Sequence, residues 1–132
     1  MLSHIELSSS VHCEFIEITD RIQRELDEFG VSDGVCYVFV PHTTAAVTIN
    51  EGADPSVKGD IQTFLAAHVP HSGDYKHMEG NSDAHIKATL LGSSETIFVE
   101  GGRLALGTWQ SIYFCEFDGP RTRRVYVRFI KA

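Results

Sequence analysis

The order of predicted helices and strands indicates a single α+β domain. The chain has 132 residues, which fits one domain, and 42% of them are hydrophobic, which is typical of a globular protein. Helices and strands are segregated, because two predicted helices follow one another in mid-chain and only strands come after them. No linker, repeat or low-complexity tract interrupts residues 1–132. We therefore expect one α+β domain rather than a doubly wound parallel sheet.

The first part of the chain predicts a strand followed by a helix. Residues 11–18 (VHCEFIEI) mostly alternate between apolar and polar side chains, as a half-buried strand does. Asp20 is suited to cap a helix that runs through Phe29, and Gly30 is well placed to end it.

Two strands and a second helix come next. Residues 35–40 (VCYVFV) form a continuous β-prone run, typical of a central buried strand, and residues 45–50 (AAVTIN) predict its neighbour. Asp54 and Pro55 are a strong helix start, and the helix they begin ends before Pro70. Its apolar stripe consists of Val57, Ile61, Phe64 and Leu65.

The remainder predicts a polar loop, a third helix and three strands. Residues 69–80 form the loop, and Asn81 or Ser82 then caps a helix that reaches about Leu91 and ends at Gly92. Turns rich in glycine and proline separate the strands that follow. These strands are residues 96–100, 110–117 and 124–130.

Charge and cysteine content narrow the classes of partner and compartment. The formal net charge of −7 repels nucleic-acid backbones and anionic membranes, so we expect neither as a partner. No apolar run approaches the ~20 residues of a membrane-spanning helix, and the N-terminus lacks a signal-like apolar core. Cys13, Cys36 and Cys115 are dispersed and predict buried thiols in a reducing compartment. We expect a cytoplasmic protein.

Three histidines predict a metal site. His42 lies just past the central strand, His77 lies in the polar loop, and His85 falls in the first turn of the third helix. Imidazole is a common ligand of divalent transition metals, and three of them leave a coordination position open. The helix dipole favours neutral His85, and the free N–H groups of the same helix start attract phosphate. We expect the remaining histidines to be solvated or to cap helices: His4, His12, His68 and His71.

Nearby polar residues predict catalytic and substrate-binding groups. Glu51, beside Asn50, is suited to act as a general base or to orient a histidine, or else is a solvated turn carboxylate. A second set donates to a phosphate, or else satisfies the strand end and caps the helix: Thr43, Thr44, Asn81 and Ser82.

A further polar set lies near the C-terminus. Arg121 belongs to a group of arginines that is unusual in so acidic a protein and indicates either anion recognition or ordinary surface charge. Trp109, beside Gln110, either packs in the core or stacks on a heteroaromatic ring of a substrate.

A long ordered set of motifs resembles one protein family. The motifs are His42-Thr43-Thr44-Ala45, Asn50-Glu51 with Ala53-Asp54-Pro55, His77-x-x-Gly80-Asn81 with Ala84-His85, Gly102 to Gln110, and Glu116 to Arg121. Over nearly its whole length the chain is similar to the YjbQ family, also called the secondary thiamine-phosphate synthase enzyme family. One departure is Gly52, where a polar residue such as asparagine is expected.

The resemblance carries expectations of its own. It implies an α+β fold with a curved, half-barrel-like mixed sheet and about three helices, assembled as a homotrimer. It also implies a histidine-lined metal pocket and a weak thiamine-phosphate synthase activity, a transferase reaction. That reaction joins a hydroxymethylpyrimidine diphosphate to a thiazole phosphate.

The residues and the resemblance together leave three hypotheses open. The first is a metal-dependent enzyme that acts on a small phosphate or diphosphate substrate, with zinc as the metal, or magnesium if the synthase reaction is its own. The second is a metal-dependent phosphoester hydrolase. The third is a metabolite- or metal-binding module without catalysis. The apolar faces of strands 110–117 and 124–130 also favour a trimer.

Overall fold

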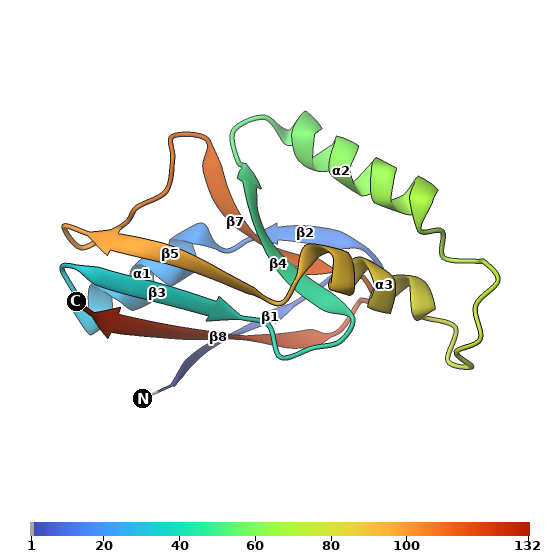
Figure 1. Cartoon of the computed structure of the whole chain (residues 1–132), viewed down its shortest axis with the longest axis horizontal. Coiled ribbons are helices and arrows are strands. Elements are labelled where there is room, and N and C mark those ends of the chain that lie inside the picture. Colours follow the sequence, from blue (N-terminus) through green and yellow to red (C-terminus); the bar gives the residue numbers. More distant parts are fainter. Residues whose placement is uncertain (1) are drawn as a thin grey trace.

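Residues 2–132 are described by a computed structural model and form two antiparallel sheets with three helices (Figure 1). The helices are α1 (Thr19–Phe29), α2 (Pro55–His68) and α3 (Ser82–Leu91). The strands are β1 (Ser3–Ser8), β2 (Glu14–Glu17), β3 (Gly34–Phe39), β4 (Ala45–Glu51), β5 (Ser94–Glu100), β6 (Arg103–Leu104), β7 (Gln110–Glu116) and β8 (Thr122–Lys131). Among the helices of residues 2–132, none has both the length and the apolar character that a membrane span needs.

The two sheets curl into a half-barrel. The order of strands is β1-β8-β3-β5-β6 in one sheet and β2-β7-β4 in the other. Every strand pair within residues 2–132 is antiparallel, so the expected mixed sheet is corrected, whereas the α+β class and the three helices are confirmed. The reason is that α1, and α2 with α3, connect strands of different sheets and so close no parallel βαβ unit.

Strands β3 and β4 follow one another in the chain but lie in different sheets. β3 pairs with β5 and β8, and β4 pairs with β7, so the predicted pairing of residues 35–40 with 45–50 is wrong. Residues 40–44 carry the chain from one sheet to the other. This crossing places His42 and its neighbours at a junction of the two sheets.

The main hydrophobic core fills the inside of the half-barrel. Ile22 and Leu26 of α1 are buried there against inward-facing residues of both sheets. α1 begins at Thr19, and Asp20 lies in its first turn without the capping role predicted for it. The Thr19 hydroxyl instead accepts a hydrogen bond of 2.8 Å from the Ile112 N–H of β7, which ties the helix start to the three-stranded sheet.

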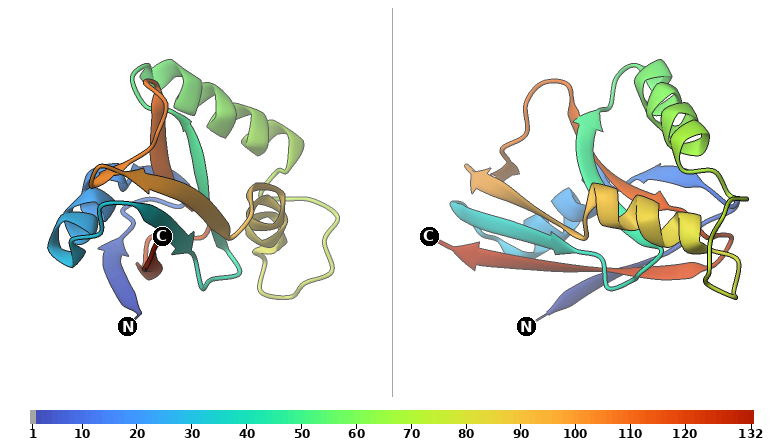
Figure 2. Two further views of the ribbon diagram at one scale, coloured as in Figure 1. Left: turned by 60° about the vertical axis from the view of Figure 1, so that its left-hand side comes forward. Right: turned by 45° about the vertical axis from the view of Figure 1, so that its right-hand side comes forward.

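A second core cluster lies on the other face of β7. Tyr113 and Cys115 face this cluster, whereas Ile112 and Phe114 face the main core, so a single chain already buries both faces of β7. The expectation that strand 110–117 needs another subunit to cover it is therefore wrong. Helices α2 and α3 lie over the second cluster (Figure 2).

Helix α2 is only loosely attached to the rest of the fold. It starts as predicted, because Asp54 accepts a hydrogen bond of 2.9 Å from the Ser56 N–H and Pro55 follows at the first helical position. None of its residues is buried, although Ile61 and Leu65 pack against the second cluster. Figure 2 shows α2 standing out from the three-stranded sheet.

Large apolar side chains are exposed on the outer face of the five-stranded sheet. Side chains along β3 and β5 point alternately outward and inward, and the inward ones are buried in the main core. The exposed apolar side chains have exposed fractions between 46% and 69%, and they are Tyr37, Phe39, Phe98 and Ile130. This outer apolar face therefore remains without cover in one subunit.

Candidate functional site

A cleft of about 810 Å³ lies at one end of the half-barrel. Four segments line it: the approach to β2, the β3–β4 loop, the loop before α3 with the first turn of α3, and the β7–β8 turn with the start of β8. Five of the seven histidines of the chain contribute to its wall: His12, His42, His71, His77 and His85.

The three histidines predicted as metal ligands all line this cleft. The rings of His77 and His85 lie edge to face, with their centroids 5.3 Å apart. His42 accepts a hydrogen bond of 3.0 Å from the Arg124 N–H at Nε2, which leaves Nδ1 as its free nitrogen. Burial, followed by the charge of Arg123, lowers the pKa of His42 below its usual value. His42 is therefore neutral at pH 7 and able to act as a metal ligand.

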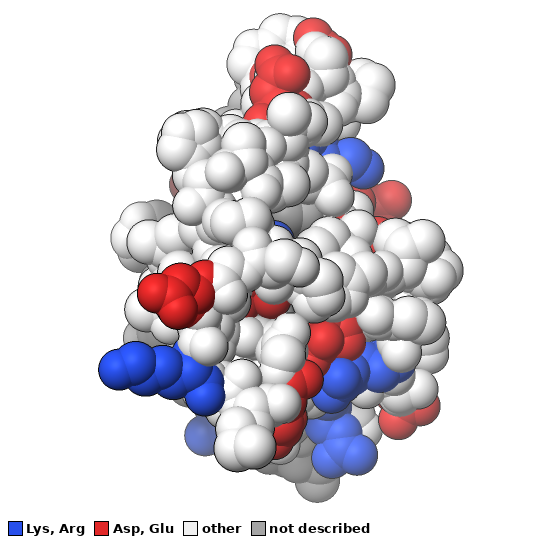
Figure 3. Space-filling model, turned by 90° about the vertical axis from the view of Figure 1, so that its right-hand side faces the viewer, with Lys and Arg blue, Asp and Glu red and all other residues white. Residues whose placement is uncertain are grey.

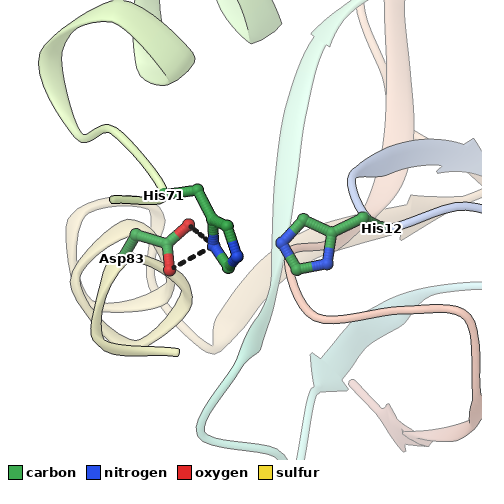
Figure 4. Close-up of side chains that lie close together, drawn as sticks. All are labelled: His12, His71 and Asp83. Atoms are coloured by element: carbon green, nitrogen blue, oxygen red, sulfur yellow. Dashed lines mark hydrogen bonds and ion pairs between the residues drawn. The ribbon is translucent and has the colours of Figure 1, made fainter. Parts of the chain in front are cut away.

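A tighter cluster lies beside them and was not predicted. His12, His71 and Asp83 each place one ligand atom within 4.8 Å of the others, and residues 2–132 contain no other such group of three or more (Figure 4). Figure 4 shows the His71 ring between Asp83 of α3 and His12 of the approach to β2. The expectation that His12 and His71 are merely solvated or capping residues is corrected. Local sequence gives no signal for this cluster, because its members meet only through the fold.

The floor of the cleft contains a buried charge network. The guanidinium of Arg123 donates from Nε to Glu116 Oε1 at 2.8 Å and from Nη2 to the Thr44 hydroxyl at 2.8 Å. Arg123 is 4% exposed and Glu116 is fully buried. Burial would raise the pKa of Glu116, but hydrogen bonds from Arg123, from the Asp118 N–H and from Ser9 together hold it below its usual value. The hydroxyl of Thr44 is thereby engaged with the protein itself.

Asn81, Asp118 and Arg121 form a linked group at the rim. Asp118 Oδ2 accepts from Asn81 Nδ2 at 2.9 Å and from Arg121 Nη2 at 3.1 Å. Asn81 therefore does not cap α3 with its side chain, and its Oδ1 is buried without a partner. Half of the Arg121 side chain is exposed, so it retains free N–H donors toward the cleft.

The charges around this end of the molecule are of both signs. Figure 3 shows acidic and basic side chains next to one another over the lower part of the face that carries the loop before α3, whereas the centre of this face is largely uncharged. Such a mixed surface exerts no strong field of a single sign. Selection of a ligand therefore depends on the groups inside the cleft.

Five of the predicted site residues lie outside this cleft. Asn50 and Glu51 are at the far end of β4, beside Trp109 and Gln110. At the rise per residue of an extended strand, this end is about 20 Å from the start of β4. The Glu51 carboxylate accepts hydrogen bonds from Ala53 and Asp54 N–H groups, a structural role in the turn before α2. Within one subunit Asn50 and Glu51 therefore lie apart from the histidines, and their catalytic roles stay predictions. Ser82 lines a neighbouring hollow together with His77 and His85.

Comparison with known proteins assigns the family. Residues 3–132 match the family model described as UPF0047 protein YjbQ-like. The chain belongs to the UPF0047 YjbQ-like family. Among UPF0047 relatives, the protein of Methanocaldococcus jannaschii is 49% identical over 130 residues, which cover 98% of this chain and 94% of that protein. YugU of Bacillus subtilis is 46% identical over 132 residues, which cover 98% of this chain and 99% of YugU.

Solved structures of UPF0047 YjbQ-like proteins share the fold. An uncharacterized conserved YjbQ/UPF0047 protein of Clostridium acetobutylicum is 56% identical, with a TM-score of 0.95 over 97% of this chain and 99% of that one. A protein of unknown function from Sulfolobus solfataricus is 33% identical, with a TM-score of 0.95 over 100% of this chain and 97% of its own. Neither of these two relatives has an assigned function that would identify the chemistry of the cleft.

Proposed function

We propose that this protein is a metal-dependent enzyme that acts on a small phosphate or diphosphate in the histidine-lined cleft. The observation that carries the proposal is the convergence of five of seven histidines on one cleft from four separate segments. Histidines with only surface or capping roles would be spread over the molecule. Perturbed and clustered titratable groups in a cleft are a general mark of a functional site.

The donor groups have the chemistry of a transition-metal site, but within residues 2–132 His42, His77 and His85 do not gather as closely as metal ligands, so binding would draw them together. His42, His77 and His85 would hold the metal, and the depressed pKa of His42 keeps that imidazole unprotonated at neutral pH. Imidazole donors suit zinc better than magnesium, because magnesium prefers oxygen ligands. Magnesium would be the metal only if the synthase reaction is the protein's own. When bound, such a metal supplies positive charge that polarises a phosphate group.

The protein groups around the histidines suit a phosphate. Arg121 offers free guanidinium donors at the rim, and Thr43 lines the cleft beside His42. Asn81 leaves the first turn of α3 without a side-chain cap, so backbone N–H groups there remain for an anion. These groups bind and orient the phosphate, whereas Arg123 and Thr44 fix the floor beneath it.

Assembly and compartment are part of the same proposal. The outer apolar face of the five-stranded sheet, which includes Phe98 and Tyr37, is suited to contact other copies of the chain, and we propose a homotrimer. The three cysteines are free, with two of them buried, which fits a reducing compartment such as the cytoplasm.

Turnover assays with and without metal test the function. Zinc-loaded protein is offered hydroxymethylpyrimidine diphosphate with thiazole phosphate, and separately a panel of small phosphomonoesters and phosphodiesters. Product analysis separates group transfer from hydrolysis. We expect turnover that needs metal, that His85→Ala removes and that Glu51→Gln, at the far end of β4, preserves.

The other outcomes decide between the remaining hypotheses. Calorimetry measures whether phosphate binds to zinc-loaded protein. If phosphate binds but no substrate is turned over, the protein is a binding module. Turnover that is indifferent to metal and to His85→Ala would contradict the proposed site.

A further inference from the structure

The cluster of His12, His71 and Asp83 lies at the same cleft but includes none of the three histidines that the proposed function assigns to its metal. Its three ligand atoms lie within 4.8 Å of one another and come from the approach to β2, the loop before α3 and α3 itself. Two imidazoles and one carboxylate are the donor set of many catalytic zinc sites and of non-haem Fe(II) sites.

His71 and Asp83 are hydrogen-bonded to each other, at a spacing that two ligands of a shared metal would also have. His71 Nδ1 lies 3.2 Å from both carboxylate oxygens of Asp83. A charge-assisted hydrogen bond is usually shorter, about 2.7–2.9 Å. Two ligand atoms on a tetrahedral zinc with bonds of about 2.0–2.1 Å stand roughly 3.4 Å apart, which is close to the observed spacing.

His12 supplies the third donor. Its ring packs edge to face on that of His71, with centroids 4.8 Å apart. Its Nε2 is buried and has no hydrogen-bond partner within the described chain. A buried polar atom without a partner is costly and calls for an explanation. A bound cation is an explanation that also accounts for the nearby carboxylate.

The charges around Asp83 favour a metal ion that binds reversibly over one that is held permanently. Asp83 is fully buried, and Lys87 Nζ stands 3.6 Å from its Oδ2 as a further cation. Lys87 is itself buried and therefore competes with any metal for the same carboxylate. His71 lies in the loop before α3 with 59% of its side chain exposed, so its ring is able to adjust.

We propose that His12, His71 and Asp83 form a second divalent transition-metal site, with its open coordination positions facing the cleft. The site does not rest on the proposed function, because it uses none of His42, His77 and His85. It would take a small anion or a water molecule beside Arg121, which lines the same cleft.

Metal titration of the full chain tests the site. Zinc chloride is titrated by calorimetry into metal-free native protein and into His71→Ala, Asp83→Asn and Lys87→Met. His68→Ala is the matched control, because His68 is an exposed histidine at the end of α2, stacked on Phe64 and outside the cleft. Thermal melts confirm that each variant is folded, and His71→Ala is expected to fold because the side chain is half-exposed.

We expect native protein and His68→Ala to bind zinc at this site, with affinity lowered at least about 100-fold in His71→Ala and Asp83→Asn. Lys87→Met removes the competing cation and should tighten binding. Long-range ¹H–¹⁵N NMR spectra of native protein should show the His12 ring nitrogens shifting on addition of zinc. These spectra decide the matter even if the Asp83 variant unfolds.

The outcomes separate this site from that of the proposed function. Loss of one zinc equivalent in His71→Ala but not in His85→Ala supports the second site alone. Loss in His85→Ala, with unchanged binding in His71→Ala and no shift of the His12 nitrogens, overturns the second site and leaves the first. Absence of zinc binding in native protein overturns both.

Discussion

Replacement of Glu116 by alanine removes the buried charge pair that joins the two sheets beneath the cleft. Glu116 lies on β7 of the three-stranded sheet, and Arg123 lies on β8 of the five-stranded sheet. The guanidinium also donates to Thr44, in the loop that crosses between the sheets. The pair is therefore a polar link at the junction on which the cleft is built.

The size of the stability loss follows from the groups that Glu116→Ala leaves without their hydrogen-bond partner. Arg123 would lose two charge-assisted hydrogen bonds while only 4% exposed, the Asp118 N–H would lose its acceptor, and the Ser9 hydroxyl would keep only its longer hydrogen bond to the Arg121 carbonyl. Removal of one partner of a buried ion pair typically costs about 3–5 kcal/mol. That is a large share of the roughly 5–15 kcal/mol that stabilises a domain.

Urea unfolding followed by circular dichroism measures the change. With a slope of about 2 kcal/mol per molar, the midpoint of Glu116→Ala should fall by roughly 2 M. Glu100→Ala, at an exposed glutamate that ends β5, is the matched control and should change the free energy of unfolding by less than about 0.5 kcal/mol. A loss below about 1 kcal/mol in Glu116→Ala would refute the argument.

The Glu116–Arg123 pair also predicts how the loss of stability in Glu116→Ala depends on pH. The folded-state pKa of Glu116 lies below its usual 4.5, so unfolded protein binds more protons at this carboxyl when the medium becomes acidic. Its contribution to stability is fully present above pH 4.5 and is lost as the pH falls through the folded-state pKa. The gap between native protein and Glu116→Ala should therefore narrow below pH 4.5 and remain constant from pH 5 to 7.

Three further predictions concern thiols, a helix cap and assembly. Burial raises the pKa of Cys36 to about 12 and that of Cys115 further, so both should resist a thiol reagent at pH 8 until urea unfolds the protein. Asp54→Ala should lower the midpoint of a urea titration, because it removes the N-cap of α2. Light scattering should give roughly three times the 14.6 kDa of one chain, and Phe98→Glu should reduce this mass whereas Phe64→Glu on α2 should not. A native mass near 14.6 kDa would contradict the trimer.

Local chemistry made the helices predictable and left the strand pairing open. α2 begins at Asp54-Pro55 and α3 ends at Gly92 as expected, because caps depend on neighbours within a few residues. Strand β1 was not predicted, although its Ile5 and Leu7 alternate with polar residues in a short run. Neighbours in a sheet depend on long-range contacts, which is why β3 pairs with β8 at the other end of the chain.

The candidate site was predicted only where its residues lie at the ends of elements. His42, His77 and His85 reach one cleft because a strand end, a loop and a helix start converge there. Glu51 follows His42 by nine positions, but β4 is extended and carries it to the opposite end of the sheet. His71 meets His12 through the packing of distant segments, which no spacing in the sequence reveals.

Anomalous diffraction at the zinc edge, from crystals grown with zinc chloride and phosphate, tests the central claim most directly. The claim is that the histidine-lined cleft holds a divalent metal beside a phosphate. We predict an anomalous peak within bonding distance of His42, His77 and His85, with phosphate density toward Arg121, and a second peak at His71 if the further site is correct. Zinc peaks found only outside the cleft, or none at all from protein that binds no zinc in solution, would contradict the account.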